Sequence, residues 1–265
     1  MRRQLRDKRI LITGASSGIG KALAERAARA GMRVVLCARS ADKLEELAAQ
    51  LRGAGRQAIA APTDITSLDA RSRLLETAKE AFGGLDLLVN NAGLGTHGLF
   101  SESSEEELRR VMEVNFFAPA ELIRQAISLL KEGQQPAVVN VASMTGRRAM
   151  PFWSEYSASK YALCGLTEAL RGELARFDID VLLICPGLTA TNLDHNLLRD
   201  NGKMIVNFRN GMKPDHVAAV ILKAIHKNRT ETVVGWEARG TLLADKFLPR
   251  IVDGVLKQIV RRVYR

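Results

Sequence analysis

The feature that most constrains the fold of this chain is a regular alternation between short apolar runs and longer segments rich in alanine and leucine. The apolar runs have the length and β-branched content of strands, and the segments between them have the length of helices. Seven such runs lie at residues 9–13, 33–38, 57–61, 86–90, 137–142, 180–185 and 232–234. The runs are nearly continuous in apolar residues, as in strands that are covered on both faces. The alternation predicts an α/β fold, with a doubly wound, seven-stranded parallel sheet and helices on both faces.

Helices are expected between these strands, the clearest at 18–30, 41–52, 68–82 and 154–177. The last of them carries small residues at Ala158, Ala162, Gly165 and Ala169, which form one stripe on a helix. Such a stripe allows another helix to approach closely. It indicates either packing within the subunit or the seam of a homodimer or homotetramer.

The chain is expected to form one catalytic domain over 1–238, followed by a basic amphipathic extension over 239–265, because no internal repeat or linker interrupts the alternation. In the extension, apolar residues recur every four positions, at Leu243, Phe247, Ile251, Val255, Ile259 and Val263. Cations lie between them, and Pro249 is expected to break the helix or begin a new one. The apolar face either packs on the body or a second subunit, or lies on an anionic membrane surface.

Most of the net charge of +10 lies at the two ends of the chain. Residues 1–9 carry +4 and residues 239–265 carry +5, so the centre is almost neutral, which argues against a nucleic-acid partner. No apolar stretch reaches the ~20 residues that span a bilayer. Three cysteines in apolar contexts suggest buried, reduced thiols, and no Cys/His cluster indicates a metal. We expect a cytoplasmic protein, peripheral to the membrane only if residues 239–265 bind lipid.

A glycine-rich turn, TGASSGIG at residues 13–20, follows the first strand and opens the first helix. Glycine permits positive φ and close approach of a ligand, and the free N–H groups of the helix N-terminus attract an anion such as a pyrophosphate. The second strand ends in Arg39, where a carboxylate would hold a ribose 2′-hydroxyl. A guanidinium there suits a 2′-phosphate. The pattern favours NADP(H), with NAD(H) as the alternative.

Tyr156 and Lys160 are four residues apart on the helix expected at 154–177, and Ser143 lies thirteen residues before Tyr156. Residues spaced by four share one face of a helix, so an ammonium is held beside a phenol. A nearby positive charge lowers the pKa of a phenol. The spacing therefore indicates an acid/base group that acts near neutral pH.

Together these motifs resemble the short-chain dehydrogenase/reductase family, whose fold is Rossmann-like. The resemblance covers about residues 8–235 and rests on TGASSGIG, Asp64-Ile65, Asn90-Asn91-Ala92-Gly93, Asn115, Ser143, Tyr156-x-x-x-Lys160 and Pro186-Gly187-x-x-x-Thr191. One departure is Ser17, at a position where many NADPH-using relatives carry a basic residue.

The resemblance implies a role for each matching residue. Ser143, Tyr156, Lys160 and Asn115 correspond to a catalytic tetrad, in which Asn115 anchors a proton-relay water. The implied cofactor contacts come from Gly14, Ser16, Ser17, Gly18, Ile19, Gly20, Arg39, Asp64, Ile65, Asn91, Ala92, Gly93, Tyr156, Lys160, Pro186, Gly187, Thr189 and Thr191. Asn90 is expected to stabilise the sheet.

The substrate is expected beyond the carboxyl ends of the strands, against Leu94, Met150, Trp153 and Leu188. These side chains favour an apolar ketone or secondary alcohol. Arg147 and Arg148 indicate either a contact with an anionic substrate group or exposed loop charge, and His97 and His195 are interpreted as loop residues. We expect an NADP(H)-dependent oxidoreductase. The alternatives are a 3-oxoacyl-[acyl-carrier-protein] reductase and a catalytically idle, NADP(H)-binding scaffold associated with a membrane.

Overall fold

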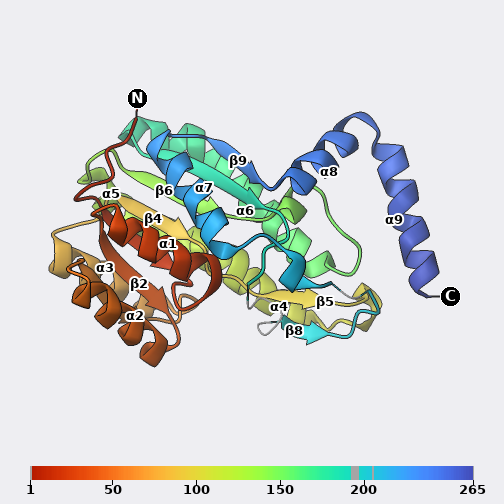
Figure 1. Cartoon of the computed structure of the whole chain (residues 1–265), viewed down its shortest axis with the longest axis horizontal. Coiled ribbons are helices and arrows are strands. Elements are labelled where there is room, and N and C mark those ends of the chain that lie inside the picture. Colours follow the sequence, from red (N-terminus) through yellow and green to blue (C-terminus); the bar gives the residue numbers. More distant parts are fainter. Residues whose placement is uncertain (1, 192–196, 205, 265) are drawn as a thin grey trace.

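The computed structural model describes residues 2–191, 197–204 and 206–264, and its centre is a seven-stranded parallel sheet (Figure 1). The strands lie in the order β3-β2-β1-β4-β6-β7-β9. Their bounds are β1 Arg9–Thr13, β2 Arg33–Ala38, β3 Ala58–Pro62, β4 Leu87–Asn90, β6 Ala137–Val141, β7 Asp180–Pro186 and β9 Glu231–Val234. The predicted fold class is confirmed, including the number and parallel direction of the strands.

Helices cover both faces of this sheet. Their bounds are α1 Gly18–Arg29, α2 Ala41–Gly53, α3 Leu68–Phe82, α4 Glu105–Met112, α5 Ala118–Lys131, α6 Ser154–Glu173 and α7 Pro214–His226. Side chains of α1, α2 and α7 join one buried cluster, and those of α3 and α5 join the other. In β1, Ile10 and Ile12 point into the first cluster and Leu11 into the second. Burial on both faces is the reason why the strands are apolar at successive positions.

Two polar links join the middle of the sheet to its surroundings. Asn90 Nδ2 donates to Asn140 Oδ1 at 2.9 Å, which connects β4 to β6, and Asn140 Nδ2 donates to Thr167 Oγ1 of α6 at 2.9 Å. All three residues are buried, so the hydrogen bonds offset the cost of removing these groups from water. The thiols of Cys37, Cys164 and Cys185 are also buried and free, as the apolar sequence context predicts.

Several short elements that the alternation did not reveal surround the carboxyl end of the sheet. Strands β5 Gly95–His97 and β8 Leu197–Asp200 pair in parallel as a separate two-stranded sheet. A π-helical turn, η2 Glu113–Phe117, joins α4 to α5. Single 3₁₀ turns occur at η1 Phe100–Glu102, η3 Met144–Gly146, η4 Leu174–Phe177 and η6 Phe208–Asn210. The interpretation of His97 as a loop residue is wrong, because it lies buried in β5. His195 is outside the described residues.

The C-terminal extension forms two helices, α8 Trp236–Phe247 and α9 Pro249–Val263, with the predicted break at Pro249. Figure 1 shows α9 extending beyond α8 at one end of the molecule. Its Asp253 pairs with Arg148 of the body, and Tyr264, directly after α9, stacks on Phe152. No residue of α9 is buried, and Ile251 and Val255 remain 60% and 51% exposed. Packing of this apolar row on the body of the same subunit is therefore wrong. Helix α8 crosses the predicted boundary at 238/239, so that division stays a prediction. Among the described residues, no helix is long and apolar enough to cross a membrane.

Candidate active site

A cavity of about 970 Å³ opens at the carboxyl edge of the sheet. It lies where the strand order reverses between β1 and β4, which is the place where doubly wound sheets bind ligands. Every residue expected to bind the cofactor lines this cavity except Gly20. The four residues expected at the substrate also line it: Leu94, Met150, Trp153 and Leu188. The fold thus brings the motifs of distant segments to one site.

The glycine-rich turn owes its shape to three glycines. Gly14 and Gly18 have φ of +68° and +54°, which side chains rarely allow. Gly20 does not line the cavity, because it faces the turn itself. A Cβ built at Gly20 would collide with the carbonyl oxygen of Gly14 and lie 2.6 Å from Asn91 Nδ2. Glycine at position 20 therefore lets α1 begin directly beneath the turn, so that the helix N-terminus points into the cavity.

Thr13 connects this turn to the next strand. Its hydroxyl accepts hydrogen bonds from the amides of Asn91 and Ala92 at 2.9 and 3.0 Å. Asn91 Nδ2 in turn donates to the carbonyl oxygen of Thr13 at 2.9 Å. These hydrogen bonds join the glycine-rich turn and the Asn91–Ala92–Gly93 segment into one wall of the cavity.

Three cations and one carboxylate line the end of the cavity near β2. The cations are Arg39, Lys43 and Arg110, and the carboxylate is Asp64. Burial alone would raise the pKa of Asp64, but hydrogen bonds from the Thr66 amide and hydroxyl, together with Arg110 and Arg39, hold that pKa below its usual value. The carboxylate is therefore charged at neutral pH. Sequence reasoning missed Lys43 and Arg110, because neither belongs to a motif and Arg110 of α4 reaches this end of the cavity only in the folded chain.

Tyr156, Lys160 and Ser143 meet in the middle of the cavity. Lys160 Nζ lies 5.7 Å from the centre of the Tyr156 ring and donates to the carbonyl oxygen of Val141 at 3.2 Å. Ser143 lies beside the phenol and acts to lower the phenol pKa. Ser143 follows β6 and Tyr156 is in the first turn of α6, so the packing of α6 beside the end of β6 brings them together.

Burial sets the protonation of this pair. It raises the pKa of Tyr156 to about 12, although Ser143 opposes the rise, and it lowers the pKa of Lys160 to about 8. The expectation that Lys160 lowers the phenol pKa below its ordinary value is wrong for this structure. Desolvation by burial is the largest cause of both pKa shifts. At neutral pH the phenol therefore holds its proton and can act as a general acid.

Asn115 does not line the cavity, although it lies directly behind it. Its Oδ1 accepts from the Leu94 amide at 3.0 Å, and its Nδ2 donates to the Leu94 carbonyl oxygen and to Ser159 Oγ, each at 2.9 Å. The π-helical turn η2 carries this side chain, and such turns often occur at functional sites. Asn115 thus ties the strand end at Leu94 to α6. Its expected role in a proton relay stays a prediction.

The remaining part of the cavity is apolar. Trp153 packs against Tyr156 and Phe208 with ring centroids 5.8 and 6.0 Å apart. Sequence reasoning missed five apolar lining residues from the segment after β7: Leu197, Leu198, Met204, Val206 and Phe208. The position of residues 188–213 beyond the strand ends predicts that this segment borders the cavity, but no periodic pattern shows which of its side chains face it.

Arg147 and Arg148 serve neither of the purposes considered for them. Arg147 forms ion pairs with Glu168 at 2.5 Å and Glu231 at 2.8 Å. Arg148 forms ion pairs with Asp253 at 2.5 Å and Asp245 at 3.2 Å, and both carboxylates belong to the C-terminal helices. Neither arginine lines the cavity, so the interpretations as a substrate contact and as free loop charge are both corrected.

The residues of the cavity fit a nicotinamide dinucleotide. The glycine-rich turn and Gly93 let a ligand approach the backbone closely. Space at Gly93 is tight, since a Cβ there would lie 3.2 Å from Asn115 Oδ1 and 3.5 Å from Lys160 Nζ. A helix N-terminus faces one part of the cavity, and a phenol with a serine faces the other. Within the described residues, no cluster of potential metal ligands occurs. The fold and site together define a nicotinamide-dinucleotide-dependent oxidoreductase.

The comparisons with known proteins give the family. The model described as "short chain dehydrogenase" matches residues 8–202, and the chain belongs to this family. It is 32% identical over 261 residues to "Ketoacyl reductase HetN" of Nostoc sp., with 98% of this chain and 89% of that protein covered. A short-chain dehydrogenase/reductase from Burkholderia phymatum in complex with NAD superposes with a TM-score of 0.85 at 28% identity, covering 94% of this chain and 96% of that one. A short-chain dehydrogenase from Burkholderia cenocepacia in complex with NADP has a TM-score of 0.78 at 30% identity, covering 89% and 100%.

Proposed function

We propose that this oxidoreductase uses NADPH to reduce an apolar ketone to a secondary alcohol, with Tyr156 as the proton donor. The observation that carries the proposal is a phenol that shares one cavity with Ser143 and with apolar side chains, and whose pKa burial raises so that it keeps its proton. A protonated acid beside an apolar pocket suits reduction of a carbonyl group better than oxidation of an alcohol.

Each residue has a defined task in this scheme. When bound, the reduced nicotinamide supplies the hydride. Ser143 donates a hydrogen bond to the carbonyl oxygen, where negative charge develops, and a donor of this kind contributes about 3 kcal/mol to the transition state. Tyr156 then transfers its hydroxyl proton to the same oxygen. Lys160, charged below pH values of about 8, stabilises the phenolate that remains.

The preference for NADPH rests on charge. Arg39 and Arg110, with Lys43, surround the end of the cavity that faces β2, and one carboxylate opposes them. A 2′-phosphate carries about two negative charges, which this excess of cations would stabilise. Binding of NAD(H) is the alternative. It would need a carboxylate at the end of β2 for the free 2′-hydroxyl, and Arg39 occupies that place.

Replacing Arg39 by glutamate is expected to lower kcat/KM for NADPH by about 10- to 100-fold, since a charge-assisted hydrogen bond of about 1.5–3 kcal/mol is lost. The value for NADH should stay level or rise. Steady-state kinetics with each cofactor measures both effects. The matched control is Arg56→Glu, an exposed charge on the loop before β3. Equal losses with the two cofactors would contradict a role at the 2′-position.

The reaction class can be tested by following oxidation of NADPH with two kinds of substrate. One is a panel of free ketones, from cyclohexanone to 2-nonanone, and the other is an acetoacetyl thioester. We expect turnover of the larger ketones. Turnover of the thioester alone would instead support a 3-oxoacyl-[acyl-carrier-protein] reductase, which the similarity to a ketoacyl reductase favours. No turnover of any carbonyl compound, with NADPH bound, would support the idle scaffold.

Assembly into a homodimer or homotetramer is proposed from the stripe of small residues on α6. Ala158, Gly165 and Ala169 are exposed in the single subunit, so packing within the subunit does not account for the stripe. A second copy could approach this face closely. Light scattering of the purified chain would give the subunit number.

Peripheral contact with an anionic membrane is proposed for α8 and α9. Leu243, Phe247, Ile251, Val255 and Ile259 leave an exposed apolar row along the two helices. Both acidic residues of 239–265 are paired with Arg148 of the body, and the same segment carries seven lysines and arginines, so it keeps an excess of positive charge. A like-charged arm of a second copy would repel this surface, whereas anionic lipid contributes about 1 kcal/mol for each Lys or Arg close to it.

Vesicle sedimentation tests this contact with the full chain. The chain should pellet with vesicles that contain phosphatidylglycerol and stay in solution with phosphatidylcholine alone. The triple variant Ile251→Asp/Val255→Asp/Ile259→Asp should lose the binding, while Leu68→Asp, an exposed leucine at the start of α3, should keep it. Failure of the unmodified chain to bind anionic vesicles would refute lipid contact. If the triple variant then proved to be a smaller oligomer, a second copy would cover the row.

A further inference from the structure

Strand β8 forms part of the wall of the substrate pocket, although little apolar burial holds it in place. Leu197 and Leu198 line the cavity, and Leu198 is 44% exposed. None of the four residues of β8 is buried. The strand pairs with β5 alone, outside the main sheet, and the register shifts within that pairing. Hydrophobic packing therefore cannot be the main force that fixes this wall.

The position of β8 decides how close Leu197 lies to the reacting groups. Leu197 is opposite Gly95 of β5. A Cβ built on Gly95 would lie 2.9 Å from Leu197 Cδ2 and 3.8 Å from Tyr156 Cδ2. Leu197 therefore fills the space that a side chain at position 95 would take, beside the ring of Tyr156. A small movement of β8 would alter the apolar pocket next to the proton donor.

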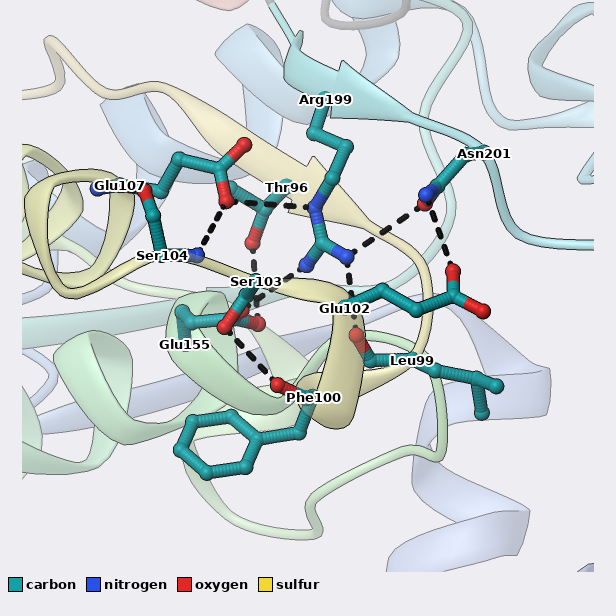
Figure 2. Close-up of polar contacts among 10 residues, drawn as sticks. All are labelled: Thr96, Leu99, Phe100, Glu102, Ser103, Ser104, Glu107, Glu155, Arg199 and Asn201. Carbon is teal, nitrogen blue, oxygen red and sulfur yellow. Dashed lines mark hydrogen bonds and ion pairs between the residues drawn. The ribbon is translucent and has the colours of Figure 1, made fainter.

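Polar contacts of Arg199 hold the strand (Figure 2). Its guanidinium forms an ion pair with Glu155 at 2.9 Å, donates to the carbonyl oxygen of Leu99 at 2.8 Å and lies 3.5 Å from Glu107. The side chain of Arg199 is 9% exposed and that of Glu155 is fully buried. One guanidinium thus connects β8 to α6, to α4 and to the turn that follows β5.

Glu155 links β8 to the active site, because it directly precedes Tyr156 in the first turn of α6. Its second oxygen accepts a hydrogen bond from Thr96 Oγ1 of β5 at 3.2 Å (Figure 2). Burying a carboxylate without a partner costs free energy, so removing the arginine alone would leave Glu155 as an unpaired buried charge and destabilise this region. The buried pair is therefore held in one geometry, whereas the side chains of an exposed ion pair change conformation freely.

We propose that Arg199 and Glu155 are positioning residues that fix β8, and with it Leu197, at the distance from Tyr156 that suits a bulky apolar substrate. The pair acts through the pocket wall and touches neither the cofactor nor the reacting atoms, since neither residue lines the cavity. The class of substrate, an extended apolar ketone, rests on the proposed function. The attachment of β8 by the pair does not depend on it.

The test uses the double variant Arg199→Met/Glu155→Gln, which removes both charges and leaves no buried ion without a partner. The matched control is Arg52→Met/Glu45→Gln, which removes an exposed ion pair on α2. Hydrogen–deuterium exchange of the peptides that cover β5 and β8 reports attachment without any need for turnover. We expect faster exchange in these peptides in the double variant, with exchange in β1 and β4 unchanged, and no change in the control.

Steady-state kinetics then distinguishes a selective effect on bulky substrates from a general loss of structure around the active site. In the double variant, KM for 2-nonanone should rise about 10-fold, which corresponds to the loss of one good contact. KM for cyclohexanone and the Kd of NADPH should stay within about two-fold, because a small ketone makes fewer contacts with Leu197 than a long chain does and the cofactor is expected against the glycine-rich turn. The single variant Arg199→Lys should recover part of the loss for 2-nonanone, since it keeps the charge without the planar fork.

The outcomes are distinguishable. Unchanged exchange in β5 and β8 would overturn the attachment of the strand. Faster exchange with equal changes in KM for both ketones, or with none, would overturn the role in selecting bulky substrates. If the unmodified protein reduced no ketone, the proposed function would fail while the exchange result would still decide whether the pair holds β8.

Discussion

Tyr156→Phe is expected to lower kcat/KM for carbonyl reduction by about 1,000-fold, because general acid catalysis contributes about 100- to 10,000-fold. Phenylalanine keeps the ring that packs on Trp153 and removes only the hydroxyl. The Kd of NADPH should therefore change by less than about two-fold. Measurement requires initial rates with a ketone that the unmodified chain reduces, and a fluorescence titration of NADPH.

A matched control is available on the same helix. Tyr161 is 43% exposed and does not line the cavity, so Tyr161→Phe should keep the rate of the unmodified protein. Reduction at near the original rate in Tyr156→Phe, with cofactor binding intact, would remove Tyr156 from the role of proton donor. Water or another side chain would then have to supply the proton.

Gly20→Ala is expected to have the second largest effect, on both stability and cofactor binding. The new methyl group would meet the carbonyl oxygen of Gly14, which is backbone and cannot turn aside as a flexible side chain can. Overpacking of this kind costs about 1–3 kcal/mol of the free energy of unfolding. Because the turn must move, we also expect the Kd of NADPH to rise at least about 10-fold.

Gly172→Ala is the control for this substitution. Gly172 lies in α6 with nothing within 4 Å of its built Cβ, so alanine there should stabilise the chain by about 0.5–1 kcal/mol. Thermal unfolding measures both variants, and a NADPH titration separates a loss of binding from a loss of stability. An unchanged midpoint and affinity in Gly20→Ala would show that α1 and the turn do not meet as closely as the structure has them.

The parts of the protein that could be predicted share one property, which is a local sequence signal. The strands and helices of the main sheet carry apolar patterns with a definite period or run length. The turn of residues 13–20 and the pair formed by Tyr156 and Lys160 carry fixed spacings. Each of these signals arises from atoms that are neighbours along the chain, so the residues themselves contain the information.

The parts that could not be predicted depend on contacts between distant segments. Strand β8 has no periodic pattern in the sequence, and its Arg199 pairs with Glu155, which lies 44 residues earlier in the chain. Arg110 of α4 has no motif, and it joins Arg39 and Lys43 only at the cavity that the folded chain forms. His97 resembles a loop residue in sequence, yet pairing with Asp200 at 2.7 Å and packing on Trp153 bury it in β5.

The protonation states of the active-site residues also could not be predicted from the sequence. The spacing of Tyr156 and Lys160 is enough to place an ammonium beside a phenol, and the structure keeps them together. The spacing does not reveal how deeply the two side chains are buried. Burial raises the pKa of Tyr156 and lowers that of Lys160. A charge interaction can be inferred from neighbours in sequence, whereas desolvation depends on all the atoms that the fold packs around a group.

From the order of its residues alone, this chain determines a doubly wound parallel sheet, a dinucleotide turn and an acid–base pair on one helix face. Tertiary structure alone decides the shape of the substrate pocket, the partners of Arg147, Arg148 and Arg199, and the exposure of the C-terminal apolar row. The physical reason is that backbone geometry and periodicity act over a few residues, while burial and ion pairing act between residues that meet only after folding.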